Sequence, residues 1–189
     1  GKIILSIVAS LLGLVLVVII GYNAYLRIAF NDFYSSARSE GKVVGLSDGL
    51  VPQGSTYVPE EKTFVSSGYM KDHSASRIYF YTDNKNPSFV TLKTPDGKDD
   101  TTHAGGVAYW NGYIFLTSGK NVNVYSWEDI KSASQKGESV SFLYEISTDY
   151  QNAFCHIEGD TLYVGEFYHE TAYPTDSSHH FTTDGGEKH

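Results

Sequence analysis

The chain has 189 residues, of which 22 are acidic and 14 basic, so its formal net charge at neutral pH is −8. All 22 acidic residues follow Asn31 but only 12 of the basic ones do, which leaves that part of the chain near −10. Such an acidic surface repels nucleic acid, and the single cysteine, Cys155, excludes an intrachain disulfide and a cysteine-only metal site.

The chain begins with an apolar segment. Residues 3–20 carry no charge, and Ser6 and Ser10 are their only polar side chains. Eighteen helical residues reach the length needed to cross a hydrocarbon core about 30 Å thick, and Tyr22 and Tyr25 follow where interfacial aromatic residues gather. We therefore predict a single-pass transmembrane anchor over residues 1–30, in contact with membrane lipid through residues 3–20. The alternative is a cleaved signal peptide, whose apolar core is shorter, about 7–15 residues.

A connector and a β-rich domain are expected after the anchor. Residues 31–49 mix serine, glycine and charges with little periodicity, which indicates a juxtamembrane connector. Residues 50–189 form the domain, because short runs of tyrosine, phenylalanine, valine, isoleucine and threonine alternate with turn residues. The runs that predict strands are residues 63–67, 77–82, 88–92, 113–118, 122–127, 140–146 and 161–167.

Two local signals are sharper than the rest. Asn111-Gly112, between two apolar runs, predicts a hairpin with a two-residue turn. Ser126 followed by Glu128 and Asp129 predicts a short helix over residues 127–134, because a serine caps a helix start and acidic side chains favour its first turn.

An internal repeat suggests how the strands are organised. A glycine or alanine opens each of three similar strand pairs, and Phe64, Phe115 and Tyr163 fall at corresponding places 51 and 48 residues apart. A period near fifty with about four strands per unit is typical of a β-propeller. We predict an all-β fold, a partial propeller of about three four-stranded blades, preceded by the transmembrane helix; an ordinary antiparallel sandwich is the alternative.

Two short motifs carry a resemblance to known propellers. The motifs Pro52-Gln53-Gly54-Ser-Thr-Tyr and His103-Ala-Gly-Gly-Val-Ala resemble blade openings in a broad superfamily. It contains gluconolactonase, senescence-marker-like proteins, streptogramin-lyase-like proteins and quinoprotein-type propellers. The resemblance covers residues 50–167 and implies a propeller fold, without assigning catalytic residues.

The number of repeats conflicts with a closed ring. Residues 50–189 hold two and a half to three units, whereas closed propellers have about four to eight blades. We therefore expect the domain to be incomplete and part of a longer protein, with closure by oligomerisation or a smaller β fold as alternatives.

Five polar residues are candidates for a binding site. Gln53, His103 and Asn152 stand at the three blade openings, where inner strands of a propeller converge on a central channel. Glu166 and His169, at the end of the last strand, can supply a carboxylate and an imidazole for proton transfer or metal binding. No metal site is assigned and no cofactor is identified; a divalent metal such as calcium stays open, with the acidic loop at residues 96–100 a weak candidate.

Two functions are compatible with these features. The leading hypothesis is a membrane-anchored, extracytoplasmic propeller that serves as a binding or scaffold module for a protein or small-molecule ligand. The alternative is a propeller hydrolase or lyase, of the lactonase or streptogramin-lyase kind, with a metal-assisted site in the central channel. The sequence leaves open whether the protein is an enzyme.

Overall fold

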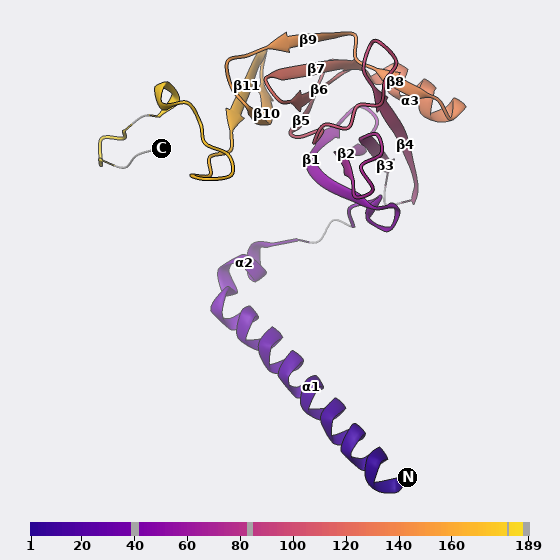
Figure 1. Cartoon of the computed structure of the whole chain (residues 1–189), viewed down its shortest axis with the longest axis vertical. Helices are drawn as coiled ribbons and strands as arrows, with labels where there is room; N and C mark the ends of the chain where they lie inside the picture. Colours follow the sequence, from indigo (N-terminus) through magenta and orange to yellow (C-terminus); the bar gives the residue numbers. More distant parts are fainter. Residues whose placement is uncertain (39–41, 83–84, 181, 187–189) are drawn as a thin grey trace. The chain divides into compact units, whose positions relative to one another are not determined.

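The computed structural model describes residues 1–38, 42–82, 85–180 and 182–186, in two compact units, Gly1–Gly41 and Lys42–His189 (Figure 1). The first unit consists of α1 (Lys2–Ala29) and the short α2 (Asn31–Ser36). No residue of α1 is buried, and the helix is apolar on all sides. It is long and apolar enough to cross a membrane, which a signal sequence also is.

The expected connector divides between the two units. Residues 42–49, including the 3-10 turn η1 (Leu46–Asp48), belong to the β unit. Val44 packs against a small cluster of Leu50, Met70 and Tyr79. The Tyr79 hydroxyl also donates a 2.9 Å hydrogen bond to the Asp48 carboxylate. These contacts extend the β unit upstream of the predicted boundary at residue 50.

The β unit contains three sheets, almost entirely antiparallel. The first has the order β1-β2-β3-β4-β8, the second β5-β6-β7-β9, and the third is the pair β10-β11. Only the second sheet has the four strands expected of each unit, and the described residues do not close into a ring or barrel. The bounds are β1 Leu50–Val58, β2 Thr63–Met70, β3 Arg77–Thr82, β4 Lys85–Lys93, β5 Val107–Trp110, β6 Tyr113–Ser118, β7 Asn121–Ser126, β8 Ser139–Ser141, β9 Tyr144–Ser147, β10 Asn152–Glu158 and β11 Thr161–Glu166.

Both sharp local predictions are confirmed. Asn111 and Gly112 have φ values of 46° and 83° and connect β5 to β6, as a two-residue turn requires. The helix α3 (Trp127–Lys136) begins after Ser126, whose hydroxyl accepts a hydrogen bond from the Asp129 amide. It ends at Gly137 in the left-handed conformation.

The single strand predicted over residues 140–146 is wrong. The chain forms β8, which pairs parallel with β4 of the first sheet, and then β9, which pairs antiparallel with β7 of the second. Between them Phe142 turns inward and meets Tyr125 edge-on, at a ring separation of 6.2 Å. The pattern of apolar residues over 140–146 does not indicate that the chain leaves one sheet and enters another within this segment.

The second sheet lies between the other two and packs on both faces (Figure 1). One core joins it to the first sheet and to α3, and it includes Val65, Ile114 and Leu116. The other core joins it to the third sheet, and there Phe115 packs with Val124 and with partly buried side chains of β10 and β11. Successive sheets therefore stack face to face.

The packing corrects the alignment of the repeat. Leu116 and Phe115 point to opposite faces of β6, as alternation requires, but Phe64 does not match Phe115. In the first sheet Val65 faces the second sheet, whereas Phe64 lies on the opposite face and is 38% exposed. The repeat in the first sheet is displaced by one residue from the repeat in the second sheet. A displacement of one residue along a strand moves each side chain to the other face of the sheet.

Truncation of Phe115 tests this packing. We expect Phe115→Ala to lower the free energy of unfolding by about 3–5 kcal/mol, because the ring fills the core between two sheets. The matched change Phe64→Ala should cost no more than about 1.5 kcal/mol, the value of its ring contacts with Tyr57 and Tyr81. Denaturant titration of the full chain in micelles, followed by tryptophan fluorescence, measures both; equal losses would contradict the assignment of faces.

The apolar surface of α1 predicts stable membrane insertion. We expect the expressed chain to sediment with membranes and to resist extraction by alkaline carbonate, because transfer of this helix to water exposes its whole apolar surface. The control is a variant with Leu12→Arg and Val15→Arg, in which α1 is no longer continuously apolar. It should be extracted, since each buried charge is costly in lipid. A soluble, full-length wild-type chain would contradict the anchor.

Candidate functional site

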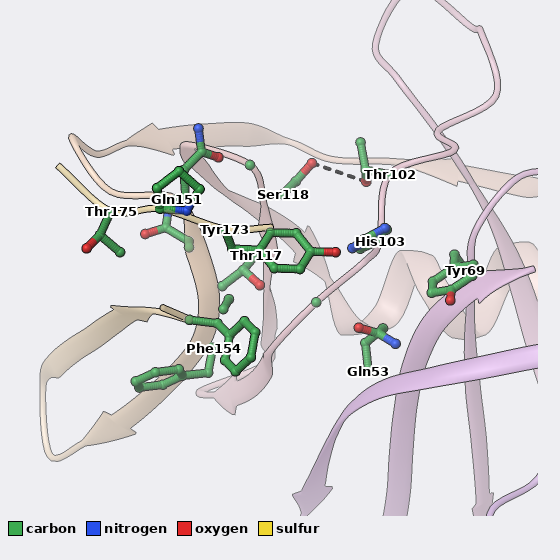
Figure 2. A pocket seen from close by; sticks show the side chains of 16 residues that line it. Gln53, Tyr69, Thr102, His103, Thr117, Ser118, Gln151, Phe154, Tyr173 and Thr175 are labelled. Carbon is green, nitrogen blue, oxygen red and sulfur yellow. Dashed lines mark hydrogen bonds between the residues drawn. The ribbon is translucent and has the colours of Figure 1, made fainter. Parts of the chain in front are cut away.

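A pocket of about 760 Å³ opens where the first strands of the three sheets begin (Figure 2). Gln53, Tyr69 and His103 lie toward one end of it in this view, and Gln151, Phe154 and Thr175 toward the other. The complete lining is Gln53, Tyr69, Thr102, His103, Gly105, Thr117, Ser118, Gly119, Gln151, Asn152, Ala153, Phe154, Phe167, Tyr173, Pro174 and Thr175.

Close backbone approach creates this pocket. The first strands of neighbouring sheets meet at two glycines, Gly54 and Gly106. A Cβ at Gly54 would lie 2.6 Å from the Gly105 carbonyl oxygen, and one at Gly106 would lie 2.4 Å from the Phe154 Cα. The Gly106 amide also donates a 3.1 Å hydrogen bond to the Ala153 carbonyl. Glycine is needed here because any side chain would separate the strands.

Irregular pairing turns the strand ends toward the pocket. The register of β1 with β2 shifts between Pro52 and Gly54, so Gln53 is the extra residue of a bulge. The register of β10 with β11 shifts in the same way at Ala153. Bulges redirect side chains at strand ends, and they occur often beside binding sites.

Three of the predicted site residues line this one pocket, but they do not form a metal centre. Asn152 is buried and its side chain exchanges hydrogen bonds with the Thr148 hydroxyl, the shorter at 2.8 Å. The Gln53 amide donates to the Pro52 carbonyl at 3.2 Å. His103 stacks on the Tyr69 ring at a centroid distance of 5.0 Å. Each of the three side chains therefore contacts a nearby residue, and the three do not converge on one another.

The structure places the side chains of Glu166 and His169 with different partners. The Nδ1 atom of His169 accepts a 3.1 Å hydrogen bond from the Ala172 amide and therefore closes a local turn. The imidazole that meets Glu166 belongs to His179, with 2.8 Å between Nδ1 and the carboxylate. The side chain of His179 is only 19% exposed. No spacing rule indicates this pair, because a loop brings the two residues together.

The electrostatic character of the pocket is neutral. No Asp, Glu, Lys or Arg side chain is among its lining residues. The acidic loop offers no calcium site, since Asp96 binds Thr94 and Lys98 while Asp99 binds Lys93. Among the described residues, no three His, Cys, Asp or Glu side chains lie close enough together to hold a metal ion.

Sequence reasoning missed the aromatic and hydroxyl groups of the lining. Phe154, Phe167 and Tyr173 provide apolar ring surface, and Thr117 also lines the pocket, with its hydroxyl buried and unpaired among the described residues. A buried hydroxyl without a partner is uncommon in proteins. Only the alternation of side chains along β6 could have suggested that Thr117 lines the pocket. No sequence pattern indicates that Phe154, Phe167 and Tyr173 do so.

Cys155 lies behind the pocket in the core between the second and third sheets. Burial raises the pKa of its thiol to about 12, and the sulfur contacts the Phe115 carbonyl at 3.6 Å. A thiol of this kind is protonated at neutral pH and serves in packing.

Comparison of the chain with protein-family models, with curated proteins and with solved structures found no match. The resemblance to propellers therefore stays a prediction, and the function is argued from the geometry of this site.

Alkylation of Cys155 tests its assignment as a core thiol. At pH 8 we expect iodoacetamide to label the folded chain roughly two to three orders of magnitude more slowly than the chain in guanidinium, because the raised pKa removes the reactive thiolate. Mass spectrometry of timed samples measures both rates. Equal rates in the two states would show that the thiol is not buried.

Proposed function

We propose that this chain is a membrane-anchored protein that binds an uncharged small ligand in the pocket between its three sheets. The observation that carries the proposal is the lining itself, which combines aromatic rings with amide and hydroxyl groups and contains no charged side chain. The volume of about 760 Å³ falls within the range of small-molecule sites.

The lining also indicates the chemistry of the ligand. An anion would find no cationic side chain here, and a metal or organic cation would find no carboxylate. Amides and hydroxyls donate and accept hydrogen bonds, while ring faces contact apolar C–H surfaces. A neutral ligand with several hydroxyl or amide groups on an apolar frame, such as a sugar, satisfies both kinds of group.

The partial propeller is part of this proposal. Three sheets built mainly from consecutive strands, stacked face to face and joined at Gly54 and Gly106, support this reading as successive blades. In such a fold the pocket corresponds to the end of the central channel. The exposed rings of Phe64 and Tyr163, on the outer faces of the end sheets, would then contact further blades or a second chain.

An extracytoplasmic location completes the proposal. The apolar α1 supports a location of the domain at a membrane surface, and a strongly acidic β unit with one cysteine suits an extracytoplasmic domain without disulfides. The metal-assisted hydrolase or lyase has less support, because Asn152 is bonded to Thr148 and no described metal-binding group surrounds Gln53 and His103.

Binding of neutral ligands is the direct test. We expect the full chain in micelles to bind members of a panel of neutral sugars and glycosides, and to ignore sugar phosphates and amino sugars of similar size, as measured by isothermal titration. Tyr69→Ala should weaken binding about 3- to 10-fold through loss of a ring surface. The matched control Tyr113→Ala changes a tyrosine outside the pocket and should leave affinity unchanged. Binding restricted to charged compounds would refute the proposal.

A further inference from the structure

One wall of the pocket is formed by a segment that leaves the third sheet. After β11 ends at Glu166, residues 167–180, which we name the strap, contribute Phe167, Tyr173, Pro174 and Thr175 to the lining. The other lining residues come from the three sheets and the loops that begin their strands. The strap therefore forms one side of the pocket.

The strap is folded by short-range contacts of its own. His169 and Tyr173 exchange two backbone hydrogen bonds of 2.9 and 3.0 Å, and the Phe167 and Tyr173 rings meet edge-on at 5.8 Å. Asp176 then caps the 3-10 turn η2 (Ser177–His179) by accepting a 2.8 Å hydrogen bond from the Ser178 amide. These contacts give the strap a shape but do not attach it to the sheets.

Among the described residues, the hydrogen bonds that attach the strap to the sheets meet at one carboxylate, that of Glu166. Glu166 accepts a 2.8 Å hydrogen bond from the Gln151 amide with one oxygen, and its other oxygen lies 2.8 Å from His179 Nδ1. The Tyr150 ring packs against the His179 ring at a centroid distance of 4.6 Å. Glu166 thus joins the segment before β10, which is part of the pocket, to the far end of the strap.

The carboxylate is ionised in this position. Burial by itself raises the pKa of Glu166, but the hydrogen bonds from Gln151 and His179 outweigh it and hold the pKa below its usual range. A carboxylate only accepts hydrogen bonds, so His179 Nδ1 carries the proton that is shared between them. With side chains 11% and 19% exposed, the pair is shielded from water more than a surface ion pair.

We propose that Glu166 and His179 form a latch that holds the strap as a removable wall of the pocket. Release of this one pair frees residues 167–180 to move while both strands of the third sheet keep their pairing. The strap then controls entry to the pocket. The latch does not depend on the chemistry of the ligand and applies to any ligand that enters the pocket.

Amide hydrogen exchange of the full chain in micelles tests the attachment. Glu166→Gln removes the charge, and His179→Phe keeps a ring against Tyr150 but removes the hydrogen bond. We expect either change to speed exchange of residues 167–179 several-fold and to leave β10 and β11 unchanged. Glu170→Gln, an exposed acid of the strap with no bonded partner among the described residues, is the control and should have no effect.

Access to the pocket is tested without any ligand. S118C introduces a thiol in the lining, against the slow background of the native Cys155. We expect E166Q and H179F each to speed its labelling by a maleimide several-fold, and the double substitution to add little to the larger single effect, because both break one latch. Unchanged labelling, fully additive effects, or faster exchange in β10 and β11 as well as the strap would each overturn the proposal.

Discussion

The architecture of the β unit depends on close contact between the backbones of its inner strands. Gly54 and Gly106 lack side chains at the two points where β1 meets β5 and β5 meets β10, and a Cβ at either would collide with main-chain atoms. This contact sets how closely the sheets stack. It thereby determines that Val65 and Leu116 fill one core and that Phe115 fills the other. A larger residue at either glycine would force two neighbouring sheets apart and disturb the core between them.

The pocket is a consequence of the same contact. The first strands meet at Gly54 and Gly106, and the bulges at Gln53 and Ala153 redirect the chain beside that point, toward the pocket. The space between them is lined by neutral groups, although the unit as a whole is acidic. Glu166 lies next to this space but directs its charge to Gln151 and His179, so a charged residue supports the wall without altering the character of the interior.

Three residues of the candidate site could be predicted, because their positions follow from strand order. Gln53, His103 and Asn152 each stand at the opening of a similar strand pair, and similar strand pairs that stack in series bring their openings together. His169 does not line the pocket, because a polar residue at a strand end has no fixed direction once the chain enters a loop. The pairing of His179 with Glu166 was not foreseen for the same reason: twelve residues separate the two in the chain, and only the folding of that segment makes them adjacent.

The sequence by itself determined features that rest on local physics. Apolar length specifies α1, a serine cap and acidic first turn specify α3, and Asn111-Gly112 specifies the tight turn between β5 and β6, because each depends on residues close in the chain. Tertiary structure alone decided which face Phe64 takes, how residues 139–147 divide between two sheets, and which imidazole meets Glu166. Those outcomes depend on register and on contacts between distant segments, where a shift of one residue or the path of one loop reverses the result.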